Sequence, residues 1–270
     1  MSVTYSKSGK VLVKCTDEEE TVIVPDGVTQ IKAEAFLNCI NLKEVILPES
    51  LKTIGVMAFR NCTSLERIKI PAGVRRVCRY TFLDCKNLEE IIFSDSLQSI
   101  QFSAFENCDS LKNVAIPDSV EDIDSYAFRN CSNLKELVYH NLHIRINFTD
   151  WYEFTYLQRT IRFINQRDYT EKIIASVKYD LLWQMFFQNP DDEKLKNYLH
   201  QYFSKIFLHL IEKDEAESVQ KILDHYDFVT KNNIDKLIKY AIDHQKLQSQ
   251  LLLMNYKASH NWQKERNLWL

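Results

Sequence analysis

The sequence predicts an α+β repeat protein, in which a β-solenoid with a 23-residue repeat is followed by an all-α helical-repeat domain. One apolar pattern recurs at a constant interval, with copies beginning at Val22, Val45, Ile68, Ile91 and Val114. A repeat of this length cannot bury its own apolar side chains, so it must stack on its neighbours. After residue 169 the apolar spacing changes to three and four residues, which is typical of helices.

Composition and charge exclude several classes of partner. The 270 residues are 45% hydrophobic, which is ample for a core. A net charge of -3 and a pI near 6.2 supply no basic field, so we expect no nucleic-acid partner and no acidic-tail function. No stretch approaches the roughly 18 apolar residues of a membrane span, so we expect no membrane partner.

The first residues bear on the location of the protein. The opening MSVTYSKSGKVLVKC lacks the apolar run of a signal peptide, so the chain as written is predicted to be cytoplasmic. If an export signal has been removed, the prediction becomes a cell-surface or secreted protein.

Residues 1–21 are predicted to form an N-terminal β-hairpin cap. Two short alternating runs, VTY and KVLVKC, flank the turn-forming segment from Ser6 to Gly9. Such a hairpin would cover the apolar end and the unpaired strand edge of the first coil.

Residues 22–146 are predicted to be the solenoid, with five full copies and a partial sixth that begins at Leu137. Each copy opens with an alternating strand, and a proline follows in four of the five, which ends the strand. A second short strand is expected on the opposite side of the coil. One phenylalanine per copy should form a buried stack, at Phe36, Phe59, Phe82, Phe105 and Phe128.

Cysteine recurs at one position of every copy, at Cys39, Cys62, Cys85, Cys108 and Cys131. Five thiols in one column cannot all pair, and no zinc-binding spacing is present, so we interpret them as reduced core residues. The residue before each cysteine is Asn, or Asp84 in the third copy. We expect its short side chain to bond backbone groups in a tight bend.

The pattern P-x-x-V/L-x-x-I…A-F-x-N-C-x-x-L resembles the BspA-like, Treponema-type leucine-rich repeats, from Val22 to about Ile146. Several members of that family are regarded as bacterial surface adhesins or as binders of host proteins. The resemblance therefore implies a curved solenoid with a β-sheet along one side, and a role as a protein-interaction scaffold.

Residues 147–168 are predicted to be a capping or linker segment, because Asn147 to Trp151 replace the expected A-F-x-N-C. The aromatic cluster of Trp151, Tyr152, Phe154 and Tyr156 is interpreted as a cover for the last coil rather than a ligand site.

Residues 169–270 are predicted to be an α-helical domain with an ankyrin-like layout of antiparallel helix pairs. The expected helices are 191–202, 203–213, 215–226, 231–244 and 246–256, with a start at Asp191 and Asp192. A weak 31-residue repeat pairs Ile206 with Leu237, Ile211 with Ile242, and Ile222 with Leu253.

No catalytic, cofactor-binding or metal-binding residue is predicted. The four glycines form no phosphate-binding loop, and no hydrolase or metalloprotease motif occurs. The histidines of the helical domain are interpreted as surface or boundary residues, and His140 and His143 would point to opposite faces of a strand.

The candidate binding site is the outward face of the opening strands. If the buried residues of a strand alternate with exposed ones, position 46 and its equivalents form an exposed column that contains several large aliphatics. The alternative is ordinary β-propensity on a solvated sheet. The predicted partner-binding residues are Ile23, Ile46, Lys69, Ile92 and Val138, with Glu44, Arg67 and Glu90 beside them.

The leading functional hypothesis is a non-enzymatic scaffold that binds a protein partner through this sheet, with a role in bacterial cell adhesion as its finer form. The second is an enzyme or effector whose active site lies in the helical domain. A third is self-association through the aliphatic column; neither the identity of the partner nor the oligomeric state follows from the sequence.

Overall fold

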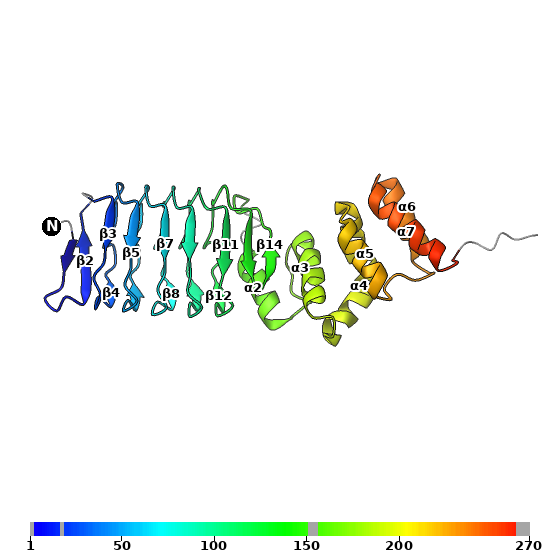
Figure 1. Cartoon of the computed structure of the whole chain (residues 1–270), viewed down its shortest axis with the longest axis horizontal. Helices are drawn as coiled ribbons and strands as arrows, with labels where there is room; N and C mark the ends of the chain where they lie inside the picture. Colours follow the sequence, from blue (N-terminus) through cyan, green and yellow to red (C-terminus); the bar gives the residue numbers. More distant parts are fainter. Residues whose placement is uncertain (1–2, 17–18, 151–155, 263–270) are drawn as a thin grey trace, which may run out of the picture. The chain divides into compact units, whose positions relative to one another are not determined.

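The computed structural model describes residues 3–16, 19–150 and 156–262, and the chain divides into two compact units, Met1–Val177 and Lys178–Leu270. The first is a β-solenoid that ends in a helix, and the second is helical (Figure 1). The predicted fold class is thereby confirmed. The division after Val177 falls within a helix, a little beyond the expected start of the helical domain.

The opening strands form one side of the solenoid. Strands β3 (Thr21–Ile23), β5 (Glu44–Ile46), β7 (Arg67–Lys69) and β9 (Glu90–Ile92) make a four-stranded parallel sheet. A second sheet holds β11 (Asn113–Ile116), β13 (Glu136–Tyr139) and β14 (Leu142–Ile144), and β14 turns back antiparallel to β13. Each strand buries one side of its pleat and exposes the other, as the alternating pattern predicts.

Shorter strands form another side. One sheet holds β1 (Val3–Tyr5), β2 (Val11–Cys15), β4 (Gln30–Ile31) and β6 (Thr53–Ile54). Another holds β8 (Arg76–Val77), β10 (Ser99–Ile100) and β12 (Asp122–Ile123). The hairpin of β1 and β2 pairs with the first coil through β4, so it covers the strand edge that the coil would otherwise expose.

A stack of phenylalanine rings fills the centre of the solenoid. The rings of Phe36, Phe59, Phe82, Phe105 and Phe128 are fully buried, and successive centroids lie 4.7 to 5.3 Å apart with nearly parallel planes. Phe148 then meets Phe128 edge-on at 6.3 Å. The predicted spine is confirmed, and its regular order changes where the repeat pattern changes.

The column cysteines are buried and carry reduced thiols, as predicted. In four of them the thiol Sγ donates a hydrogen bond to the carbonyl oxygen of the phenylalanine 26 residues earlier, at 3.0 to 3.2 Å. Burial raises the pKa of the Cys85 and Cys108 thiols well above its usual range, so they stay protonated donors. Cysteine therefore supplies a small apolar volume together with one weak donor.

The bend residues bond one another, so the expectation that they bond the backbone is wrong. Asn38, Asn61, Asp84, Asn107 and Asn130 all have φ between 56° and 64°, a region that Asn and Asp tolerate better than most residues. Asn61 Nδ2 donates to Asn38 Oδ1 at 2.9 Å, and Asn130 Nδ2 donates to Asn107 Oδ1 at 3.1 Å. The Asp84 carboxylate accepts from Asn107 at 2.7 Å, but it has no amide N–H of the kind that Asn donates at the other positions.

Helix α2 (Leu157–Gln166) packs on the last coil. Its Asn165 Oδ1 lies 2.7 Å from the buried Tyr139 hydroxyl, and its Gln158 Nε2 donates to Asp122 Oδ1 at 3.2 Å. Leu157 and Ile161 of α2 are buried. Most of the predicted aromatic cap, residues 151–155, lies outside the described residues, and α2 supplies a helical cover that the sequence did not predict.

The helices that follow are α3 (Ala175–Gln188), α4 (Glu193–Lys213), α5 (Ala216–His225), α6 (Ile234–Asp243) and α7 (Leu247–Ser259). Asp192 caps α4 by accepting from the Leu195 amide at 3.0 Å, so the predicted start is confirmed. The predicted break at Phe203 is wrong. No Pro or Gly interrupts this stretch, and buried residues continue at helical spacing through Leu199, Phe203 and Ile206.

The 31-residue register is partly reflected in burial. Ile206 and Leu237 are both buried, as are Ile222 and Leu253. The remaining pair differs, because Ile211 is fully buried whereas its counterpart Ile242 is 50% exposed.

Candidate functional site

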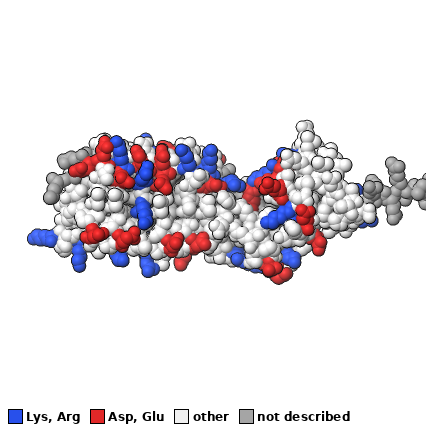
Figure 2. Space-filling model, viewed as in Figure 1, with Lys and Arg blue, Asp and Glu red and all other residues white. Residues whose placement is uncertain are grey.

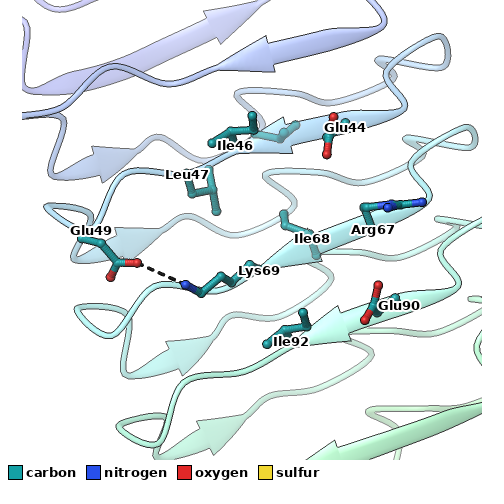
Figure 3. A pocket seen from close by; sticks show the side chains of 10 residues that line it. Glu44, Ile46, Leu47, Glu49, Arg67, Ile68, Lys69, Glu90 and Ile92 are labelled. Atoms are coloured by element: carbon teal, nitrogen blue, oxygen red, sulfur yellow. Dashed lines mark hydrogen bonds and ion pairs between the residues drawn. The ribbon is translucent and has the colours of Figure 1, made fainter.

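The candidate site is the outward side of the opening strands, which we call the strand face and define by Ile23, Ile46, Lys69 and Ile92. The strands pair in register, so Ile23 lies opposite Ile46 and Lys69 opposite Ile92. The middle residue of each strand is buried, which turns its neighbours outward. Figure 3 shows Ile46, Lys69 and Ile92 on successive strands.

The isoleucines of the strand face are strongly exposed. Ile23 is 68% exposed, Ile46 48% and Ile92 47%. Single exposed aliphatics are common on any protein, but several in register on one sheet form an apolar row, which here is interrupted once, by Lys69 between Ile46 and Ile92. In Figure 2 the charged side chains of the solenoid gather along two edges and leave a largely uncharged band between them.

A shallow open hollow of about 360 Å³ lies on the strand face. Its lining combines the apolar row, the charged residues beside it and the buried middle residues of two strands. Ten residues line it: Glu44, Val45, Ile46, Leu47, Glu49, Arg67, Ile68, Lys69, Glu90 and Ile92. Six of the eight predicted partner-binding residues therefore lie together at this hollow.

The charges beside the apolar row alternate in sign. Arg67 pairs in the sheet with Glu44 on one side and Glu90 on the other, so the margin reads acidic, basic, acidic. On the other side, Lys69 Nζ lies 3.5 Å from Glu49 Oε1, and the two side chains are 67% and 69% exposed. Exposed ion pairs contribute little to stability. These charges are therefore free to re-pair with groups of a ligand.

The two remaining predicted residues lie elsewhere. Ile23 extends the strand face by one strand beyond the hollow. Val138 is only half-buried on β13 in the second sheet, where it pairs with His143 of β14. The structure does not bring Val138 to the hollow.

The BspA type leucine rich repeat region family matches residues 11–135, in six copies. The solenoid belongs to this family. No curated protein sequence matches the chain.

Solved structures of bacterial leucine-rich repeat proteins are similar to this chain. TpLRR of T. pallidum is 34% identical over 50% of this chain and 66% of its own, with a TM-score of 0.46. A leucine-rich repeat protein from Bacteroides ovatus is 30% identical over 44% of this chain and 37% of its own, with a TM-score of 0.40. The pneumococcal vaccine antigen PcpA is 24% identical over 51% of this chain and 33% of its own, with a TM-score of 0.43. The chain thus spans less than two thirds of the length of each of these three.

Sequence reasoning missed four of the ten lining residues of the hollow, and two of these four, Leu47 and Glu49, are not buried. Alternation along the strand places Leu47 on the same side as the buried Val45, but Leu47 is only half-buried, whereas its counterparts Val24 and Ile70 are buried. Glu49 follows Pro48, beyond the strand, and reaches the hollow through its contact with Lys69. Neither position departs from the repeat pattern, so only the folded coil reveals it.

A second hollow of the leucine-rich repeat region, about 480 Å³, is lined by Arg79, Tyr80, Gln101, Phe102, Asp122 and Asp124. The Tyr80 and Phe102 rings meet edge-on at 5.5 Å. Asp122 accepts a hydrogen bond from Gln158 of α2, so this hollow adjoins the helical cover of the last coil.

A partly buried polar cluster joins α3 to α4. The Asp180 carboxylate lies 2.8 Å from His209 Nε2 and also accepts from Lys213 Nζ. Burial disfavours ionisation of Asp180, but the hydrogen bonds from His209 and Lys213 outweigh this and hold its pKa below the usual value. Sequence reasoning missed this contact because the partners lie 29 and 33 residues away. His209 is a boundary residue, as predicted.

We expect Asp180→Asn to lower the free energy of unfolding of the helical unit by about 1–3 kcal/mol at pH 7, since a charge-assisted bond is lost. A depressed folded-state pKa means that the contribution is present above the unfolded value of about 3.9 and disappears as the pH falls through the folded-state pKa. Urea unfolding at pH 7 and near pH 3 checks this. The exposed Asp243→Asn is the control, and an equal loss for Asp180→Asn at both pH values would contradict the assignment.

Among the described residues, no three His, Cys, Asp or Glu side chains are arranged to hold a metal ion. None of the described helices is both long and apolar enough to cross a membrane.

Proposed function

We propose that the chain is a non-enzymatic protein-binding module that recognises its partner through the strand face. The observation that carries this proposal is the row of exposed isoleucines on the opening strands. The repeating core holds these strands in register, so the isoleucines of neighbouring repeats lie on the same side of the sheet. Exposed apolar patches rimmed by polar residues mark protein interaction sites. Membership of the solenoid in the BspA-type leucine-rich repeat family supports the same role.

The strand face defines the chemistry of its partner. The apolar row calls for aliphatic or aromatic side chains spaced by the 4.7–4.9 Å of neighbouring strands. The margin of Glu44, Arg67 and Glu90 calls for a basic, acidic, basic sequence of charges opposite it. The apolar row would provide most of the affinity, and the alternating charges would fix the register and exclude partners of the wrong polarity.

Adhesion at a bacterial cell surface is a finer version of this proposal. It draws on the family resemblance, and the prediction of a cytoplasmic location from the first residues stays a prediction. An enzymatic role of the helical unit has less support, because its partly buried cluster of Asp180, His209 and Lys213 forms ion pairs that join two helices. Such a pair serves packing and leaves no group poised for proton transfer.

The test replaces two isoleucines of the strand face. We expect Ile46→Lys with Ile92→Lys to weaken partner binding at least tenfold, because two ammonium groups would be desolvated in an apolar contact. Both side chains point into solvent, so the melting temperature should change little. Immobilised protein would be used to capture partners from a lysate and from a panel of matrix proteins, and surface plasmon resonance would give the affinities.

A matched control is available in the same solenoid. Ile40 and Val56 are 47% and 40% exposed but lie outside the opening strands. Ile40→Lys with Val56→Lys adds the same charge to a similar amount of exposed apolar surface. If both double variants bind equally well, or equally poorly with intact folds, the strand face is not the binding site.

A further inference from the structure

The last helix pair carries an exposed apolar surface, which we call the terminal stripe and define by Ile242, Leu247, Leu251 and Met254. Ile242 lies near the end of α6, and the other three follow along α7 at spacings of four and three residues, which places them on one side of that helix. Their exposed fractions are 50%, 72%, 60% and 48%. All four are among the large hydrophobic side chains that are exposed in the described part of the chain.

The opposite side of α7 is already packed. Ser249 and Leu253 are fully buried, and α7 contacts both α5 and α6. A surface helix is normally apolar on one side only, whereas a helix that is apolar on both sides is typically enclosed. Helix α7 therefore has the composition of an internal member of a helix stack.

The 31-residue register shows what covers such a side. The counterparts of Ile242 and Met254 are Ile211 and Leu223, and both are buried in the preceding pair, α4 and α5, on which α6 and α7 pack. The counterparts of Leu247 and Leu251 are Ala216 and Gln220, which are half-buried. The terminal stripe is thus more apolar than the equivalent side that an antiparallel helix pair covers.

The charge pattern is compatible with a second copy of the same surface. Residues 247–256, LQSQLLLMNY, contain no charged side chain over nearly three turns. Figure 2 likewise shows few charged atoms over α6 and α7 on the side in view. Lys257, at the end of this stretch, is paired with Asp235 of α6. Two copies of the stripe can therefore meet without like-charge repulsion, and each supplies a helix pair that covers the stripe of the other.

We propose that the terminal stripe is the interface of a homodimer, in which the α6–α7 pairs of two copies pack face to face about a two-fold axis. An isologous contact of this kind needs only one self-complementary surface and closes after two subunits. The contact is independent of the strand face, so dimerisation would present two strand faces to a partner and increase its avidity.

The test measures the mass of the full chain by analytical ultracentrifugation over a range of concentrations. We expect a dimer for the wild type and at least about 100-fold weaker association for Leu247→Lys with Leu251→Lys, since the interface would then bury four unpaired charges. Circular dichroism establishes that the variant is folded. The Ile46→Lys and Ile92→Lys variant is the control and should remain dimeric.

Three results would overturn the proposal. One is a wild type that stays monomeric at high micromolar concentration. Another is a dimer that survives the Leu247 and Leu251 substitutions, or that is lost on substitution of the strand face alone. The third is a monomeric full chain whose shortened form, ending at residue 262, dimerises, because residues 263–270 would then be the occupant of the stripe.

Discussion

Replacing Phe82 with alanine should lower the free energy of unfolding of the leucine-rich repeat solenoid by about 3–5 kcal/mol. Phe82 is fully buried between Phe59 and Phe105, with ring centroids at 5.3 and 5.2 Å and planes within 5° of parallel. The substitution leaves a cavity and removes two aromatic contacts, each worth about 0.5–1.5 kcal/mol beyond burial. Because each coil packs only on its neighbours, a cavity in the middle coil weakens both halves of the stack.

Hydrogen exchange followed by mass spectrometry checks this result, because it reports on peptides of the solenoid separately from those of the helices. Peptides on both sides of Phe82 should lose protection together. Phe102→Ala is the matched control, since Phe102 is a partly exposed aromatic residue of the same solenoid. If Phe102→Ala caused as large a loss of protection as Phe82→Ala, the buried phenylalanine stack would contribute no more to the stability of the solenoid than a partly exposed aromatic residue does.

The second large effect is expected for Trp183→Ala, which should lower the free energy of unfolding of the helical unit by about 3–5 kcal/mol. Trp183 is 2% exposed, and its ring lies about 6 Å from Phe187, Phe207 and Phe228. Its Nε1 donates to the Ile206 carbonyl oxygen at 3.4 Å, which links α3 to α4. The substitution removes the largest side chain at the centre of an aromatic core.

Urea unfolding followed by far-ultraviolet circular dichroism measures this loss, because that signal comes mainly from the helices. Tyr202→Ala, at an aromatic position that is 39% exposed, is the control and should cost far less. Protection of the solenoid peptides should be unchanged, since each compact unit has its own core. Loss of protection in both units would mean that they unfold as one cooperative body.

Features that repeat were predictable from the sequence. The same residue type at the equivalent position of five repeats indicates a structural role more reliably than a single residue does. The phenylalanine stack and the column of reduced, buried cysteines were predicted correctly on this basis. The bonding of the bend asparagines was not. A single repeat read alone offers only backbone partners, whereas the nearest amide in the folded coil belongs to the next repeat along the chain.

The helical part was harder to predict because its repeat is weak. The continuous α4 was split in the prediction, since two short periodic segments and one long helix have similar patterns around Phe203. The cluster of Asp180, His209 and Lys213 depends on which sides of α3 and α4 meet, and that choice is made by tertiary packing. Exposure of the terminal stripe likewise depends on where the stack stops, which periodicity alone does not reveal.

For the strand face, alternation within a strand was enough to predict which residues point outward. It was not enough to define the hollow, because Leu47 and Glu49 reach the surface through the course of the coil after the strand. The position of Val138 depends on β14, which folds back on β13 in the sixth, partial repeat.

The constant repeat length also determines how this fold can change in size. The buried thiol bonds and the ring stack connect each coil only to its immediate neighbours. One whole repeat could therefore be duplicated or lost within the array while both ends keep their covers. Each added coil would lengthen the strand face by one strand, or about 4.8 Å. Recombination between repeats would thus change the length of the strand face by one strand at a time, and the core residues of each coil would stay the same.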